Sequence, residues 1–186
     1  MSNETLPQMP VPKRPENGLL AWQATMGYIS SEHSPDALLT FQATPNEGGL
    51  AWSGTITWMH NSELVNDKPS LPAAMRDLWK EVTRSHHIFN SFEAAVRQPI
   101  NYRDDQWLDA DTQGSLDRLL QTTAAVFGDD WKLVMVYQPV EAPALRVQVR
   151  LLARNNVVHI GGRGASLRDA CRELYRNAAK DFRQFK

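Results

Sequence analysis

The chain has 186 residues, 42% of them hydrophobic and 22% charged, a composition typical of one globular domain or two small ones. It contains no apolar run of the ~18 residues that a membrane-spanning helix needs, so a membrane partner is not expected. The single cysteine, Cys171, excludes an internal disulfide and a cysteine-rich metal site. We therefore expect an intracellular, cytoplasmic protein that uses neither a metal nor a cofactor.

The net charge of −1 hides an uneven distribution along the chain. Residues 1–143 carry 10 Lys/Arg and 18 Asp/Glu, which gives −8, whereas residues 144–186 carry 10 and 3, which gives +7. Such polarisation indicates either a basic surface for an anionic partner or two parts of the chain that attract one another.

Residues 1–17 contain Pro, Asn and Glu and lack the apolar core of a signal peptide, so we expect a flexible tail. Residues 18–82 form a first predicted unit, in the order helix, three strands, helix. Its elements are expected at residues 19–28, 38–44, 50–59, 63–65 and 71–82. The first of these segments fits two interpretations, because every second residue from Leu20 to Tyr28 is apolar, as in a strand. Only the repeat described below favours the helix.

Residues 83–113 are predicted to link this unit to a second one, since they are long for a loop within a compact domain. The run from Asn90 to Glu93 resembles a capping box before a short helix that continues through Arg97. The rest of the linker is an acidic connector.

Residues 114–186 are predicted to repeat the order helix, three strands, helix, and this unit is basic at its C-terminal end. Its first four elements are expected at residues 115–127, 132–138, 144–153 and 157–160. The strand at 132–138 is apolar on both faces, so both faces should be covered. In the strand at 144–153, Leu145 should point inward and Arg146 outward. Ser166 is expected to cap the long last helix.

The segments SLPAAMRDLW from Ser70 and SLRDACRELY from Ser166 share one pattern, 96 positions apart. Apolar positions agree across four segments of the chain at this offset, or at one residue less, although few residues are identical. We therefore predict an α+β fold made by tandem duplication of an α-β-β-β-α unit. Each unit would hold an antiparallel three-stranded sheet and two helices, and the two would pack as a pseudo-dimer.

The order of elements in residues 115–184 resembles a double-stranded-RNA-binding domain. The last helix of that family begins with Gly-x-Gly-x-Ser-Lys-Lys-x-Ala-Lys, and the run from Gly162 to Cys171, GRGASLRDAC, matches its glycines, its serine, its alanine and one basic residue, Arg168. Two lysines are replaced, and PVEAP from Pro139 lacks the Gly-Pro-x-His loop of the family. The resemblance implies this fold, with RNA contacts partly lost.

Basic residues recur every fourth position along the last helix, and other arginines precede it. The candidate nucleic-acid-binding residues are Arg146, Arg150, Arg163, Arg168, Arg172, Arg176 and Lys180. Such a stripe would neutralise phosphates along a duplex. The competing interpretation, which we favour, is a solvated helix face that pairs at i+3 spacing with Asp169, Glu173 and Asp181. The strand arginines could equally meet acidic residues of the first half.

Other candidate sites are better explained by structure than by chemistry. The run from Asp109 begins like a calcium loop, but its twelfth position is Leu120, so helix capping explains it better. His86 and His87 point apart on a helix and have no third ligand nearby in sequence. Cys171 lies on an apolar stripe and is predicted to be buried. The strand face with Trp52 and Trp58 is predicted to be core, with a docking surface as the alternative.

No catalytic motif is present, so we predict a non-catalytic binding or assembly protein. A protein partner or self-association is slightly favoured over a structured RNA or DNA bound by the arginine-rich last helix. An enzyme is the third hypothesis, which a deep polar pocket with His86 or His159 beside the acidic connector would favour. Internal pairing of the two charged parts would support assembly, and a continuous basic band across the last helix would support nucleic acid.

Overall fold

The computed structural model describes residues 15–32, 34–86 and 102–185. Within these ranges the order helix, three strands, helix occurs twice. The first run consists of α1 (Gly18–Glu32), β1 (Leu38–Asn46), β2 (Gly49–Trp58), β3 (Asn61–Lys68) and α2 (Leu71–Ser85). The second run consists of α4 (Ala110–Phe127), β4 (Trp131–Tyr137), β5 (Val147–Ala153), β6 (Val158–Gly164) and α5 (Leu167–Asp181). The protein is therefore an α+β protein, as predicted.

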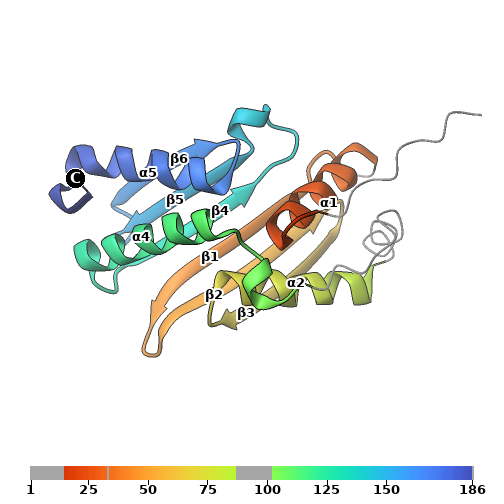
Figure 1. The fold of residues 1–186 in the computed structure, drawn as a ribbon, viewed down its shortest axis with the longest axis horizontal. Helices are drawn as coiled ribbons and strands as arrows, with labels where there is room; N and C mark the ends of the chain where they lie inside the picture. Colours follow the sequence, from red (N-terminus) through yellow and green to blue (C-terminus); the bar gives the residue numbers. More distant parts are fainter. Residues whose placement is uncertain (1–14, 33, 87–101, 186) are drawn as a thin grey trace, which may run out of the picture.

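All six strands belong to one antiparallel sheet in the order β3-β2-β1-β4-β5-β6 (Figure 1). The order mirrors itself about the central β1–β4 pair, in which Thr40 lies opposite Val136, 96 positions further along the chain. This symmetry is what two copies of one unit would give around a two-fold axis. The duplication itself stays a prediction.

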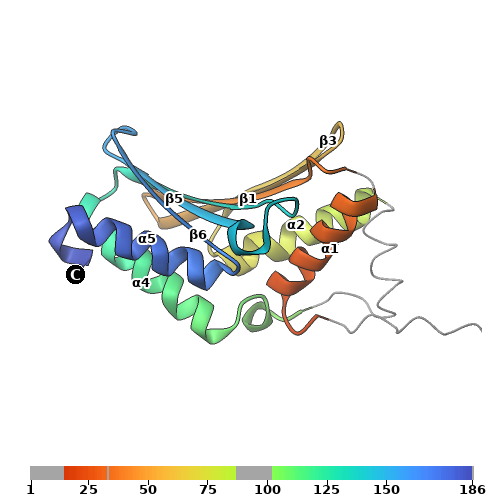
Figure 2. The same cartoon turned by 90° about the horizontal axis from the view of Figure 1, so that it is seen from above.

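The four α-helices of the described residues cover the same face of the sheet, and none of them lies on the opposite face, which we call the helix-free face (Figure 2). The sheet curves away from the helices toward both of its ends, so the helix-free face is concave (Figure 2). Between helices and sheet lies one continuous apolar core. The largest fully buried side chains of this core include Trp22, Trp79, Trp107, Phe185, Met26 and Ile29.

The segment at residues 19–28, whose alternating pattern also fitted a strand, lies within the helix α1, which confirms the prediction of a helix. Asn17 caps it through a hydrogen bond from the Leu20 N–H to Asn17 Oδ1 (2.9 Å). Trp22 anchors this helix on α2: its Nε1–H donates to the Met75 carbonyl (3.2 Å), and its ring contacts Trp79 edge-on with the ring centroids 4.9 Å apart. Trp22, Met26 and Ile29 are all fully buried, a spacing that places them on one face of a helix but not on one face of a strand.

The closing helices α2 and α5 begin as predicted. Ser70 Oγ accepts a hydrogen bond from the Ala73 N–H, and Ser166 Oγ accepts one from the Asp169 N–H. Each helix then buries one apolar stripe, at positions 96 apart. The corresponding pairs are Leu71 and Leu167, Ala74 and Ala170, Met75 and Cys171, Leu78 and Leu174, and Val82 and Ala178.

Four predictions about the second run were wrong in part. The strand expected at 157–160 is β6, which continues to Gly164. The strand expected at 144–153 begins only at Val147, because Pro143 starts a 3₁₀ turn and leaves Leu145 exposed. The strand β4 is buried on the helix side alone, and Val136 is only half-buried on the helix-free face. The helix expected from Ser115 begins at Ala110 and is capped by Asp109.

The face with the two tryptophans of β2 is core, as predicted, since Trp52, Ile56 and Trp58 are all buried. Within the described residues no helix is both long and apolar enough to cross a bilayer. The predicted tail and the helix expected over 90–97 lie largely or wholly outside the described residues.

Candidate binding surfaces

The structure divides the seven predicted basic residues between the two faces of the sheet. Val149 and Leu151 are fully buried beneath the helices, so Arg150 between them points to the helix-free face. Arg163 points the same way, since its neighbours Gly162 and Gly164 contact α5. Arg146 precedes β5, and its Nε–H donates to the Glu141 carbonyl (3.1 Å). The other four residues lie on α5, on the opposite side of the sheet.

A groove of about 630 Å³ runs between α4 and α5, which lie side by side in front of the sheet in Figure 1. Three of the predicted residues line it, namely Arg168, Arg172 and Arg176, and α4 adds Arg118. We call this the α4–α5 groove. Sequence reasoning missed Arg118, because nothing in the sequence places α4 beside α5.

One cation of the α4–α5 groove is neutralised. Asp111 of α4 forms an ion pair with Arg168, with Oδ2 and Nη1 2.9 Å apart. Among the described residues, Arg118, Arg172 and Arg176 have neither an ion pair nor a hydrogen bond from their side chains. Three guanidinium groups of one groove are therefore available to an anion.

The local pairing that we favoured from the sequence is absent from the described part of α5. Asp169 Oδ2 accepts a hydrogen bond from the Ser166 hydroxyl (2.8 Å) as part of the helix cap. Glu173 accepts a hydrogen bond from the backbone N–H of Arg163 in β6. The carboxylates of Asp169 and Glu173 therefore satisfy other groups, so Arg172 and Arg176 of α5 have no carboxylate partner among the described residues.

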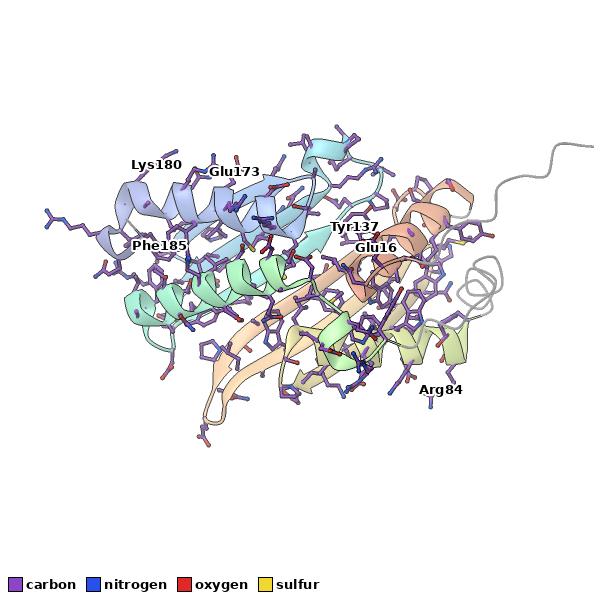
Figure 3. The ribbon with its side chains drawn as sticks, in the orientation of Figure 1. Glu16, Arg84, Tyr137, Glu173, Lys180 and Phe185 are labelled. Atoms are coloured by element: carbon purple, nitrogen blue, oxygen red, sulfur yellow. The ribbon has the colours of Figure 1, made fainter. Side chains whose placement is uncertain are left out.

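Lys180 does not belong to the α4–α5 groove. Its Nζ donates to Asn177 Oδ1 (3.1 Å), and Figure 3 shows Lys180 and Glu173 on the side of α5 away from α4. The regular four-residue spacing misplaces Lys180, because four residues exceed one helical turn by about 40° and the stripe rotates around the helix.

Pairing between the acidic and the basic part of the chain is slight. Among ion pairs of the described residues, only that between Asp111 and Arg168 joins residues 1–143 to residues 144–186. Within the described part of the chain, neither Arg146 nor Arg150 forms an ion pair with a carboxylate of residues 1–143. Arg150 Nη2 instead donates to Gln148 Oε1 (2.9 Å).

The glycines that resemble the RNA-binding motif have a packing role in this protein. A Cβ atom on Gly162 would lie 2.2 Å from the Ala170 carbonyl oxygen and 2.3 Å from the Leu174 nitrogen. A Cβ atom on Gly164 would lie 2.8 Å from the Ala170 nitrogen. Both glycines are thus required for α5 to rest directly on the β6 backbone.

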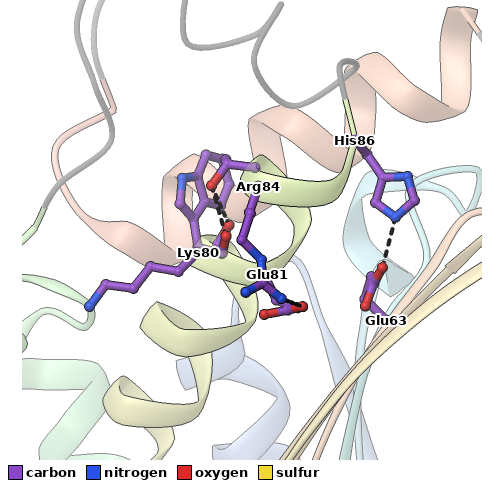
Figure 4. Close-up of polar contacts among 7 residues, drawn as sticks. Glu63, Lys80, Glu81, Arg84 and His86 are labelled. Carbon is purple, nitrogen blue, oxygen red and sulfur yellow. Dashed lines mark hydrogen bonds and ion pairs between the residues drawn. The ribbon is translucent and has the colours of Figure 1, made fainter.

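The remaining candidate residues take structural roles. Burial raises the pKa of the Cys171 thiol to about 12, which suits a packing residue and not a nucleophile. His86 Nε2 lies 2.8 Å from Glu63 Oε1 and joins the end of α2 to β3 (Figure 4). His87 lies outside the described residues. The described residues hold no cluster of three metal-ligating side chains.

Comparisons of the chain with protein families, with curated proteins and with solved structures give no match. The resemblance to the double-stranded-RNA-binding fold therefore stays a prediction. What bears on function is the geometry described above.

Proposed function

We propose that the protein is a non-catalytic binding protein that holds a structured nucleic acid in the α4–α5 groove. One observation carries the proposal: Arg118, Arg172 and Arg176 share this groove and have no carboxylate partner among the described residues. Unpaired like charges in one groove repel each other, so an anion that bridges them would be bound favourably.

A guanidinium group suits this role because its fork of N–H donors matches the oxygens of a phosphate. Successive phosphates along a nucleic acid would meet successive turns of α5 on one side and Arg118 of α4 on the other. Tyr175, which also lines the groove, would add a hydroxyl to the contact. The sequence slightly favours a protein partner, but the unpaired arginines support nucleic acid better.

Binding of fluorescein-labelled 20-base-pair RNA, followed by anisotropy, tests the proposal. Three phosphate contacts give a salt slope of about −2.7, so affinity should fall about 40-fold between 50 and 200 mM salt. The variant R118Q/R172Q/R176Q should lose this binding. The control variant K80Q/R84Q/R103Q removes as much charge from the first run and the segment after it, and should bind like the wild type.

Two results would refute the nucleic-acid proposal. One is a wild-type protein that shows no salt-sensitive binding to RNA or DNA at 50 mM salt. The other is a groove variant that binds as tightly as the control variant, since the charge of the whole molecule would then be responsible. Circular dichroism should show that both variants keep the helix content of the wild type.

A second candidate function is self-association through the helix-free face of the sheet. Val134 and Val136 lie half-buried on the central strand β4 of this face, where no helix of the described residues covers them. A second copy of the chain packed against this strip would bury them. If so, light scattering should give the mass of a dimer, and V136K should return a monomer. A monomeric wild type at 100 μM would exclude this candidate.

A further inference from the structure

We infer a second binding site, on the helix-free face at β5 and β6, for a small molecule that carries an oxyanion, either a phosphate or a carboxylate. A pocket of about 510 Å³ lies there. Its polar lining comes from Gln148 and Arg150 of β5, from His159 and Arg163 of β6, and from Glu173 of α5. The volume lies within the range of small-molecule sites, roughly 300–1,000 Å³.

The register of β5 and β6 gathers the basic residues around a glycine. Arg150 lies directly opposite Gly161, and Gln148 lies opposite Arg163. Arg150 and Arg163 are therefore diagonal neighbours on one face of an antiparallel pair. A Cβ atom built on Gly161 meets nothing within 4 Å. The glycine thus leaves an open floor between two guanidinium groups.

A buried amide holds Arg150 in place. Gln148 is only 4% exposed, although it lies on the helix-free face. Its Nε2–H donates to Gln138 Oε1 (3.0 Å), and its Oε1 accepts from Arg150 Nη2 (2.9 Å). This chain of hydrogen bonds fixes the guanidinium before any ligand arrives, which reduces the entropy lost on binding. The other N–H groups of the Arg150 guanidinium have no partner among the described residues.

The charge of the pocket favours an anion, and its wall favours an apolar group beside that anion. Glu173 is the one carboxylate in the described lining, and it already accepts a hydrogen bond from the Arg163 N–H. Leu145 of the 3₁₀ turn, which is 38% exposed, forms an apolar wall. A ligand with an oxyanion at one end and an apolar body at the other would use both features.

This pocket is independent of the α4–α5 groove, because the sheet separates them. An enzyme would have been favoured by a polar pocket with His86 or His159 beside the acidic connector, and this pocket differs from such a site. His159 lines the pocket, but the lining includes no residue of the acidic connector. The residues that line it are arranged to bind an oxyanion, and no reaction is inferred.

Isothermal titration calorimetry with four probes tests the inference. Phenyl phosphate and inorganic phosphate represent one class of oxyanion, benzoate represents the other, and benzyl alcohol is the neutral control. We expect saturable binding of phenyl phosphate or benzoate, with the tighter of the two identifying the class. Inorganic phosphate should bind more weakly than phenyl phosphate because it cannot use the Leu145 wall, and benzyl alcohol should not bind.

Two variants locate the site. R150Q should weaken binding of the preferred probe at least about tenfold, because it removes a charged hydrogen-bond donor. G161V should abolish binding by filling the floor, and the open space at this position and its extended strand allow valine without strain. The groove variant R118Q/R172Q/R176Q should bind the probe like the wild type, and G161V should bind RNA like the wild type.

The inference fails if the wild type binds neither oxyanion saturably, or if R150Q binds the probe as tightly as the wild type. It also fails if RNA displaces phenyl phosphate, since the pocket would then be part of the nucleic-acid surface. RNA binding by the groove variant tests the proposed function alone: its loss supports that function, its retention refutes it, and neither result bears on the pocket. The two results can therefore be separated.

Discussion

The two closing helices, α2 and α5, carry basic residues at the same three positions but differ in how these charges are used. Arg76, Lys80 and Arg84 of α2 correspond to Arg172, Arg176 and Lys180 of α5, 96 positions further on. In α2, Arg76 Nε lies 3.0 Å from Asp77, and Arg84 pairs with Glu81 (Figure 4). Two of its three cations are thus neutralised within the helix.

In α5 the residues at the positions of the two acidic partners, Asp77 and Glu81, form hydrogen bonds with the sheet instead. Glu173 occupies the position of Asp77 and accepts a hydrogen bond from the backbone of β6. Asn177 occupies the position of Glu81, and its Nδ2–H donates to the Gly161 carbonyl (2.8 Å). Both side chains satisfy backbone groups at the open edge of the sheet. The comparison shows that neighbouring carboxylates neutralise two cations of α2, whereas the polar residues at the corresponding positions of α5 bond to the β6 backbone instead.

The helices also differ in how closely they approach their strands. In the second run, Gly162 and Gly164 allow α5 to rest on the β6 backbone. In the first run, β3 has no glycine and Val65 packs against the core instead. A methyl group at Gly162 should therefore disturb the second run in a way that has no counterpart in the first.

The largest expected effect is that of G162A. The new methyl group would overlap backbone atoms of α5, which cannot move aside as a flexible side chain can, and we expect a loss of about 3 kcal/mol in unfolding free energy. G161A is the matched control and should cost far less, since its methyl group meets open space. Urea denaturation followed by tryptophan fluorescence measures both. Equal losses would show that α5 does not depend on this close approach.

An intermediate effect is expected from removal of the two helix caps. S70A and S166A should each lower the unfolding free energy by about 1 kcal/mol, because each leaves a helical N–H without its acceptor. S166A should cost slightly more, since the Ser166 hydroxyl also donates to Asp169 (2.8 Å). Thermal unfolding compares the two variants. If either variant unfolded with the same free energy as the wild type, the two serine caps would not have equivalent roles in α2 and α5.

The smallest effect concerns the ion pairs that distinguish α2. Burial alone would raise the pKa of Asp77, but hydrogen bonds from Lys68 and Arg76 outweigh it and hold the pKa below its usual 3.8. The ionised carboxylate therefore stabilises the fold above this pH, and the contribution is lost as the pH falls below it.

D77N lacks this carboxylate and should show a smaller loss of stability between pH 6 and pH 3. Because the ion pair is partly exposed, the difference from the wild type should be roughly 0.5 kcal/mol. Urea denaturation at the two pH values measures it. If the two proteins lost the same stability, the ion pairs of α2 would not contribute to the fold.

Local features of this fold could be predicted from the sequence, since neighbouring residues determine them. Ser70 and Ser166 cap helices in any packing, and the apolar stripes of α2 and α5 follow from helical periodicity. Pro143 gave a local signal for the turn before β5, but the alternation after it suggested a longer strand. The pattern of α1 alone fitted a strand as well as a helix, and only the correspondence with the segment 96 positions further on favoured the helix that is present.

The candidate sites depend on contacts between segments that are distant in the chain. Arg118 joins the α4–α5 groove only because α4 packs beside α5, and Arg150 is separated from this groove only because the sheet lies between them. The apolar pattern of β4 suggested cover on both faces. In the structure Val136 is half-buried, with Thr40 and Gln148 opposite it on the neighbouring strands.

The central pairing of β1 with β4 has a consequence for any attempt to study either half alone. Cutting the chain between residues 86 and 102 would strip β1 or β4 of its neighbour and leave a long row of unsatisfied N–H and C=O groups. Each fragment would then tend to recruit another copy of itself, or its missing complement, along that row. The intact polypeptide avoids this because it carries its own complementary strand, tethered at high effective concentration.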